Sequence, residues 1–127
     1  MTRYILLILG ISLILTLIIE LLVTFIMGVR SKHGAKLIVL INVITNPVAV
    51  LLCWLADMYV PFGWELMAFI LIELTVVFAE ARILQLFANA KEYRIKHPVK
   101  LAITANLTSC LLGIVINELI RIYLIYN

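Results

Sequence analysis

The glutamates within otherwise apolar stretches of this chain include Glu20, Glu73 and Glu80. Their positions are costly, because a charged side chain at the centre of a bilayer costs about 2.5 to 3.5 kcal/mol on insertion scales. A carboxyl group in such surroundings can hold a proton, or it can bind a hard cation together with amide oxygens. These glutamates are therefore our first candidates for an ion-binding site.

Polar side chains in all four apolar stretches lie at a similar distance from the basic segments of the chain. At a helical rise of about 1.5 Å per residue, Glu20 and Glu80 lie roughly 10 to 15 Å from those segments, as do Asn46 and Ser109. Independently placed residues need not share a depth, so we expect one polar cluster between the helices. The candidate ion-binding residues are Glu20, Asn42, Asn46, Glu73, Glu80, Asn106 and Ser109.

Three interpretations of this cluster remain open. The glutamates could line a cavity that holds water or a cation. They could instead be protonated and donate hydrogen bonds to Asn42 or Asn106. Finally, the polar groups could simply hold helices together, each contributing about 0.6 kcal/mol. The first two require Glu20 and Glu80 to point inward, toward the amides.

The composition predicts helices that cross a membrane. The chain has 127 residues, of which 65% are hydrophobic and 13% charged, and its mean hydropathy is +1.20. A transmembrane helix needs about 20 apolar residues. The stretches that qualify are 4–28, 37–59, 64–87 and 101–126. We predict an all-α integral membrane protein, a four-transmembrane-helix bundle that forms a single membrane domain over residues 1–127.

One sequence phrase occurs twice at a constant offset of 64 residues. Lys-His-x-x-Lys-Leu begins at Lys32 and again at Lys96, and Asn42 is matched by Asn106. We interpret this as a duplicated helical hairpin, with repeats at 4–59 and 64–126 in the same orientation, as in parallel-repeat transporters. The alternative is that two loops acquired basic residues independently.

Basic residues mark the same two segments and predict the orientation of the chain. The residues are Arg30, Lys32, His33, Lys36, Arg94, Lys96, His97 and Lys100. By the positive-inside rule both loops are cytoplasmic, so both termini lie outside a plasma or inner membrane. The cations should also attract anionic lipid headgroups.

Two further patterns describe how the helices meet. Ser12, Thr16, Glu20 and Thr24 are four residues apart and form one stripe on a helix. In the second stretch Pro47 cannot donate a backbone hydrogen bond, so we expect a kink there.

Several classes of function find no support in the sequence. Recognised hydrolase, nucleotide and redox motifs are missing, so we expect neither an enzyme nor a cofactor. His33 and His97 lack nearby thiols or carboxylates, so we expect no metal site. The basic loops are too short to form a nucleic-acid-binding domain. The size and the glutamate of the first span resemble the small multidrug transporters, which also have four spans, but no motif is shared.

The sequence therefore favours a small cation- or proton-coupled carrier or channel that works as a homo-oligomer. Glu20 and Glu80 would bind the ion, and asparagines would supply neutral oxygens. The alternative is an interaction or accessory subunit embedded in a larger membrane complex, with the polar stripes docking against a partner.

Overall fold

The chain folds into helices joined by short connections. A computed structural model of the chain describes residues 2–126, except for the side chains of residues 2–8, 117, 120–121 and 124–126. The helices are α1 (Thr2–Ile26), α2 (Lys32–Tyr59), α3 (Glu65–Ala88) and α4 (Pro98–Tyr126). α2 is continuous through Pro47.

Three of these helices, within the described residues, are long and apolar enough to cross a membrane. The qualifying segments are Leu9–Ile26 of α1, Lys32–Tyr59 of α2 and Pro98–Ile116 of α4. α3 is also long, but any 18 consecutive residues of it include Glu73, Glu80 and Arg82. The same charged residues that suggest chemistry therefore keep α3 from meeting the length and composition criteria that the other helices meet.

Two helices begin earlier than the hydrophobic stretches suggested. α2 begins at Lys32 rather than at residue 37, and α4 begins at Pro98 rather than at residue 101. Lys32, His33 and Lys36 thus lie in the first turns of α2, and Lys100 lies in the first turn of α4, instead of in loops. The cause is local, because a serine cap precedes α2 and proline is well suited to the first position of a helix.

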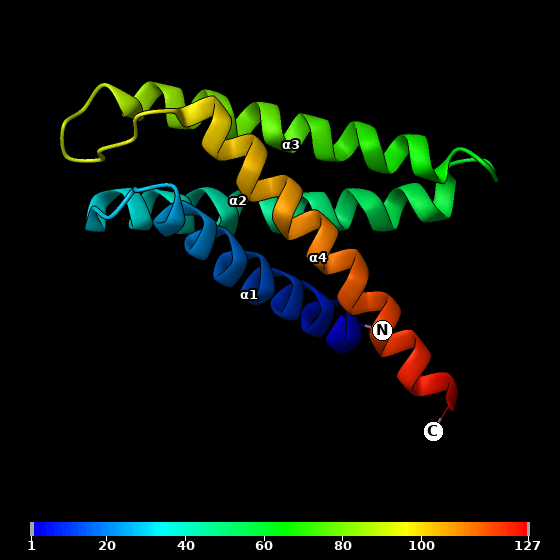
Figure 1. Cartoon of the computed structure of the whole chain (residues 1–127). Coiled ribbons are helices and arrows are strands. Elements are labelled where there is room, and N and C mark those ends of the chain that lie inside the picture. Colours follow the sequence, from blue (N-terminus) through cyan, green and yellow to red (C-terminus); the bar gives the residue numbers. More distant parts are fainter. Residues whose placement is uncertain (1, 127) are drawn as a thin grey trace.

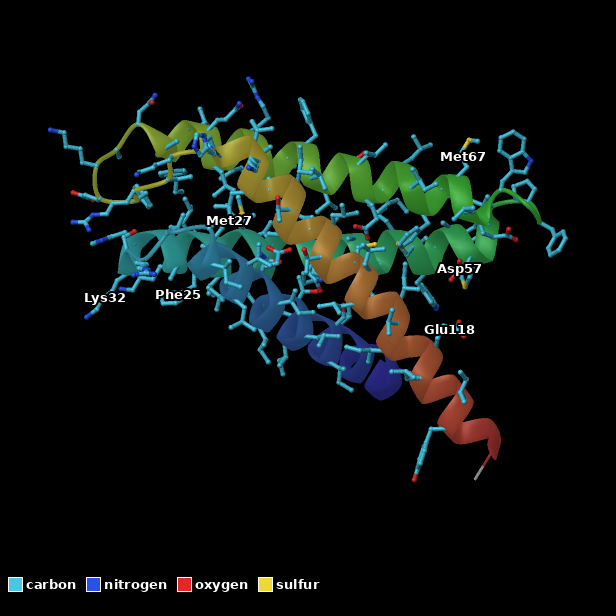
Figure 2. The ribbon with its side chains drawn as sticks, viewed as in Figure 1. Phe25, Met27, Lys32, Asp57, Met67 and Glu118 are labelled. Carbon is cyan, nitrogen blue, oxygen red and sulfur yellow. The ribbon has the colours of Figure 1, made fainter. Side chains whose placement is uncertain are left out.

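The helices form an antiparallel bundle in which each helix has two neighbours. α1 packs against α2 and α4, and α3 packs against the same two helices. The connections 27–31 and 89–97 lie at one end, here called the basic end (Figure 1). The connection 60–64 and the outer ends of α1 and α4 lie at the opposite end (Figure 1). Accordingly, Lys32 and Phe25 lie at the basic end, and Asp57 and Met67 lie at the other (Figure 2).

The polarity of the bundle is reversed relative to a water-soluble protein. Among the side chains that the structure describes, five polar ones are at most 6% exposed: Glu20, Thr24, Asn42, Glu80 and Asn106. Large apolar side chains, in contrast, face outward on every helix, with Ile26 80% exposed, Phe78 68% and Leu107 56%. Soluble proteins rarely leave so large a continuous apolar surface uncovered.

Backbone hydrogen bonds and a serine cap fix the basic end. α1 ends in a Schellman motif, in which Gly28 has φ +90°, Val29 N–H donates to the Thr24 carbonyl and Gly28 N–H donates to the Phe25 carbonyl. Ser31 Oγ accepts from Gly34 N–H at 2.9 Å and donates to the Tyr93 carbonyl at 2.8 Å. This serine therefore caps α2 and joins the two connections.

Gly34 is buried where these connections meet, and we predict that Gly34→Ala destabilises the protein. A Cβ there would lie 2.6 Å from Val29 Cγ1 and 2.9 Å from the Tyr93 carbonyl oxygen. Overpacking of this kind costs about 1 to 3 kcal/mol. The free energy of unfolding in detergent measures the effect. Gly10→Ala is the matched control, since its Cβ would meet nothing within 4 Å; equal stability of the two variants would contradict the packing described here.

Candidate functional site

Glu20 accepts hydrogen bonds from two helices. Asn42 Nδ2 on α2 donates to its Oε2 at 2.7 Å, and Ser109 Oγ on α4 lies 3.3 Å from its Oε1. Glu20 itself is 1% exposed. Its carboxyl group is thus enclosed between both neighbours of α1, as expected for a glutamate that points inward.

Glu80 has the corresponding partners on the same two helices. Asn106 Nδ2 on α4 donates to its Oε2 at 2.6 Å, and Thr45 Oγ1 on α2 lies 2.6 Å from its Oε1. Glu80 is 3% exposed. All four carboxyl oxygens of the pair therefore have a protein partner.

The two sets of contacts are reciprocal. Each glutamate receives an amide from the next helix of its own hairpin, α1–α2 or α3–α4, and a hydroxyl from the other hairpin. Asn42 corresponds to Asn106 and Thr45 to Ser109, at the same offset of 64 residues that relates the basic phrases. We call Glu20, Asn42, Thr45, Glu80, Asn106 and Ser109 the polar cluster.

Backbone carbonyls hold both amides in one orientation. Asn42 Nδ2 also donates to the Ile38 carbonyl at 3.1 Å, and Asn106 Nδ2 donates to the Ala102 carbonyl at 3.0 Å. Both hydrogens of each amide nitrogen are used, because a side-chain amide has two of them. The nitrogen, not the oxygen, of each amide consequently faces its glutamate. This differs from the expectation that a protonated glutamate would donate to the asparagine.

The hydroxyl groups have two partners for a single proton. Thr45 Oγ1 lies 3.0 Å from the Ile41 carbonyl as well as close to Glu80, and Ser109 Oγ lies 3.0 Å from the Asn106 carbonyl. Either hydroxyl can donate to its carboxylate. Alternatively, it can donate to the backbone carbonyl and accept a hydrogen bond from the glutamate when its carboxyl group is protonated.

The remaining candidates lie outside the polar cluster. Asn46 bridges two polar groups of α1, donating to Thr16 Oγ1 at 3.0 Å and accepting from Ser12 Oγ at 3.3 Å. Glu73 is half-buried two turns from Glu80 and makes no hydrogen bond among the described contacts. The structure therefore brings together Glu20, Asn42, Glu80, Asn106 and Ser109 of the predicted set, but not Asn46 or Glu73.

Two polar residues were not among the predicted site residues although a signal for each was present. Thr45 lies 64 residues before Ser109, so the repeat that relates Asn42 to Asn106 also relates Thr45 to the predicted site residue Ser109. Thr24 belongs to the four-residue stripe of Glu20, is 1% exposed and has a hydroxyl with no hydrogen-bond partner. Buried polar atoms without a partner are rare and costly.

The basic residues lie away from the polar cluster, around the connections at the basic end. A cavity of about 110 Å³ there is lined by Met27, Gly28, Val29, Arg94, Ile95, Lys96, His97 and Leu101. His33 packs edge-on against Tyr93, with ring centroids 6.2 Å apart. In the described part of the chain, no three His, Cys, Asp or Glu side chains are grouped so that they could hold a metal ion.

Comparisons with protein-family models, curated proteins and solved structures found no match to this chain. The site must therefore be interpreted from its own geometry.

We predict that Asn106→Leu destabilises the protein more than the double change Asn106→Leu with Glu80→Leu. The single change leaves Glu80 Oε2 buried without a donor, which costs about 1 to 3 kcal/mol, whereas removing both partners leaves no unpaired atom. The unfolding free energies of both variants in detergent measure the difference. Thr75→Val is the control, because this exposed hydroxyl bonds only within its own helix; a double variant less stable than the single one would contradict the pairing.

Proposed function

We propose that this chain is a small integral membrane protein that carries or conducts protons, with Glu20 and Glu80 as the groups that hold them. The observation that carries the proposal is the pair of hydroxyl groups in the polar cluster. Thr45 and Ser109 can satisfy their glutamates in both charge states, because a backbone carbonyl is available as the alternative acceptor. A site that must gain and lose a proton needs partners of this kind.

The reversed polarity supports insertion in a membrane. Exposed Ile, Leu and Phe side chains cover the outside of the bundle while carboxyl and amide groups are buried within it. In lipid, ionisable residues of spanning helices face the bundle interior and pair with one another. α3 would then span the membrane as the fourth helix, with Glu73 and Glu80 turned away from lipid.

The geometry favours a proton over a metal cation. Hard cations bind oxygen lone pairs, but both asparagines turn their nitrogens toward the glutamates. Backbone carbonyls hold them in that orientation.

The basic residues at the basic end also predict the orientation of the chain in the membrane. We propose that the basic end faces the cytoplasm, where its lysines and arginines contact anionic lipid headgroups, and that both termini face the other side. The pairs Asn42/Asn106 and Thr45/Ser109, both at the offset of 64 residues, support a duplicated hairpin with parallel repeats. Glu20 and Glu80 are 60 residues apart, so they depart from that offset by about one helical turn. A homo-oligomer is compatible with the exposed apolar surface.

The alternative, an accessory subunit of a larger complex, fits the contacts less well. It requires polar or small-residue stripes that face outward toward a partner. On α4 the small residues Ala105 and Ser109 lie four residues apart, but Ala105 is 1% exposed and Ser109 contacts Glu20, so both are already used within the bundle. A heterologous protein that co-purifies in fixed ratio from native membranes would favour the alternative.

We predict that Glu20→Gln combined with Glu80→Gln abolishes proton flux in proteoliposomes. Glutamine keeps a carbonyl oxygen to accept from the asparagine but cannot take up or release a proton. Flux is measured with a pH-sensitive dye enclosed in the vesicles, under an imposed pH gradient and membrane potential. Parallel vesicles with a K⁺ or Na⁺ gradient test for a metal cation.

The control is Glu92→Gln, since Glu92 is exposed in the connection 89–97 at the basic end and is not part of the polar cluster. It should conduct like the native protein. Native-like proton flux in the double glutamine variant would reject the assignment of the pair. Flux of K⁺ or Na⁺ in the absence of proton flux would contradict the proposal that the transported ion is a proton.

A further inference from the structure

The two glutamates have reciprocal partners, but the layers above and below them differ. One turn toward the basic end, the four helices contribute Thr24, Ile38, Leu84 and Ala102. All four side chains are at most 3% exposed. In this basic-side layer, Thr24 next to Glu20 is polar, whereas Leu84, at the corresponding place next to Glu80, is not.

The layer on the far side of the cluster shows the same difference between α1 next to Glu20 and α3 next to Glu80. One turn away from the basic end, the helices contribute Thr16, Asn46, Val76 and Cys110. Asn46 donates to Thr16 Oγ1 and accepts from Ser12 Oγ. Val76, at the corresponding place next to Glu80, is apolar. Glu20 therefore has hydroxyl groups on its own helix face in both directions, and Glu80 has none.

The buried hydroxyl of Thr24 indicates a path for protons through the bundle. Its hydroxyl is buried without a partner inside an otherwise apolar layer. Valine has nearly the same shape and would avoid the cost of an unpaired polar atom. The cavity of about 110 Å³ at the basic end begins beyond this layer, where Met27 and Leu101 line it, and it is large enough to hold water.

We propose that Glu20 is the member of the pair that exchanges protons with the two ends of the bundle, along the hydroxyls of α1. This inference rests on the proposed function and specifies its route. Thr24 lies one turn after Glu20 on α1 and three residues before Met27, which lines the cavity at the basic end. Thr16 and Ser12 extend the route toward the opposite end, and Asn46 is hydrogen-bonded to both hydroxyls and positions them.

The transfer conserves atoms and charge. A hydronium ion in the cavity gives a proton to Thr24 Oγ1 and becomes water. Because Thr24 Oγ1 has no direct hydrogen-bond partner, the original hydroxyl proton passes through an intervening water to the Glu20 carboxylate. One O–H bond forms on the glutamate, and the threonine ends as it began. The ionisable groups coupled electrostatically to Glu20 are Glu80 and Glu73, both on α3. α2 and α4 face Glu20 with the neutral side chains of Asn42 and Ser109.

The experiment compares variants of Thr24 in the proteoliposome assay. Thr24→Val should lower proton flux by about tenfold or more, which is 1.4 kcal/mol of added barrier. Thr24→Ser keeps the hydroxyl and should retain most of the flux. The unfolding free energy in detergent provides the structural readout: Thr24→Val should be at least as stable as the native protein, because it removes an unpaired buried group.

A second pair of variants tests the asymmetry. Glu20→Gln should lower flux about tenfold further than Glu80→Gln. Adding Leu84→Thr to Thr24→Val places a hydroxyl beside Glu80 and should not restore flux. Native flux in Thr24→Val, equal losses in the two glutamine variants, or restored flux in the double variant would each overturn the route while leaving the proposed function standing. Absence of flux in the native protein would overturn both.

Discussion

The bundle depends on a reciprocal exchange of hydrogen bonds between two buried carboxyl groups and two helices. Glu20 and Glu80 would each be too costly to bury alone, but an asparagine and a hydroxyl satisfy each of them. Because each hydroxyl comes from the opposite hairpin, neither hairpin satisfies its own glutamate fully. The polar cluster therefore holds the two hairpins to each other. A change of charge at either glutamate affects hydrogen bonds to both hairpins.

In the membrane environment that we propose, the apolar exterior and the buried polar cluster have a common physical origin. In lipid, apolar surface between helices gives little driving force for association, so packing and interhelical hydrogen bonds must supply it. The polar cluster provides such bonds at the middle of the bundle, and Ser31 with Tyr93 provides one at the basic end. Apolar residues such as Leu84 and Leu101 fill the space between these two levels. Outward-facing residues such as Phe78 are left for the surroundings to cover.

Much of this arrangement could be predicted from the sequence, for identifiable reasons. The helical rise placed Glu20 and Glu80 at one depth, and the hydrophobic stretches located every helix. Capping was underestimated, so α2 and α4 begin earlier than expected. The contacts of Thr45 and Ser109 with the glutamate of the opposite hairpin could not be predicted, because they depend on which helices become neighbours. The same holds for the position of Glu73 outside the hydrogen-bonded polar cluster, since helical spacing alone places it on nearly the same face as Glu80.

The central claim is that the amides of Asn42 and Asn106 are bound to the two glutamates inside the bundle. Side-chain amide NMR signals in lipid bilayers or detergent test this most directly, with the exposed Asn89 as an internal reference. The account predicts that the Asn42 and Asn106 amide hydrogens exchange with water far more slowly than those of Asn89. It also predicts that Glu20→Gln shifts the Asn42 signal and Glu80→Gln that of Asn106. Exchange as fast as at Asn89, with no shift in either variant, would contradict it.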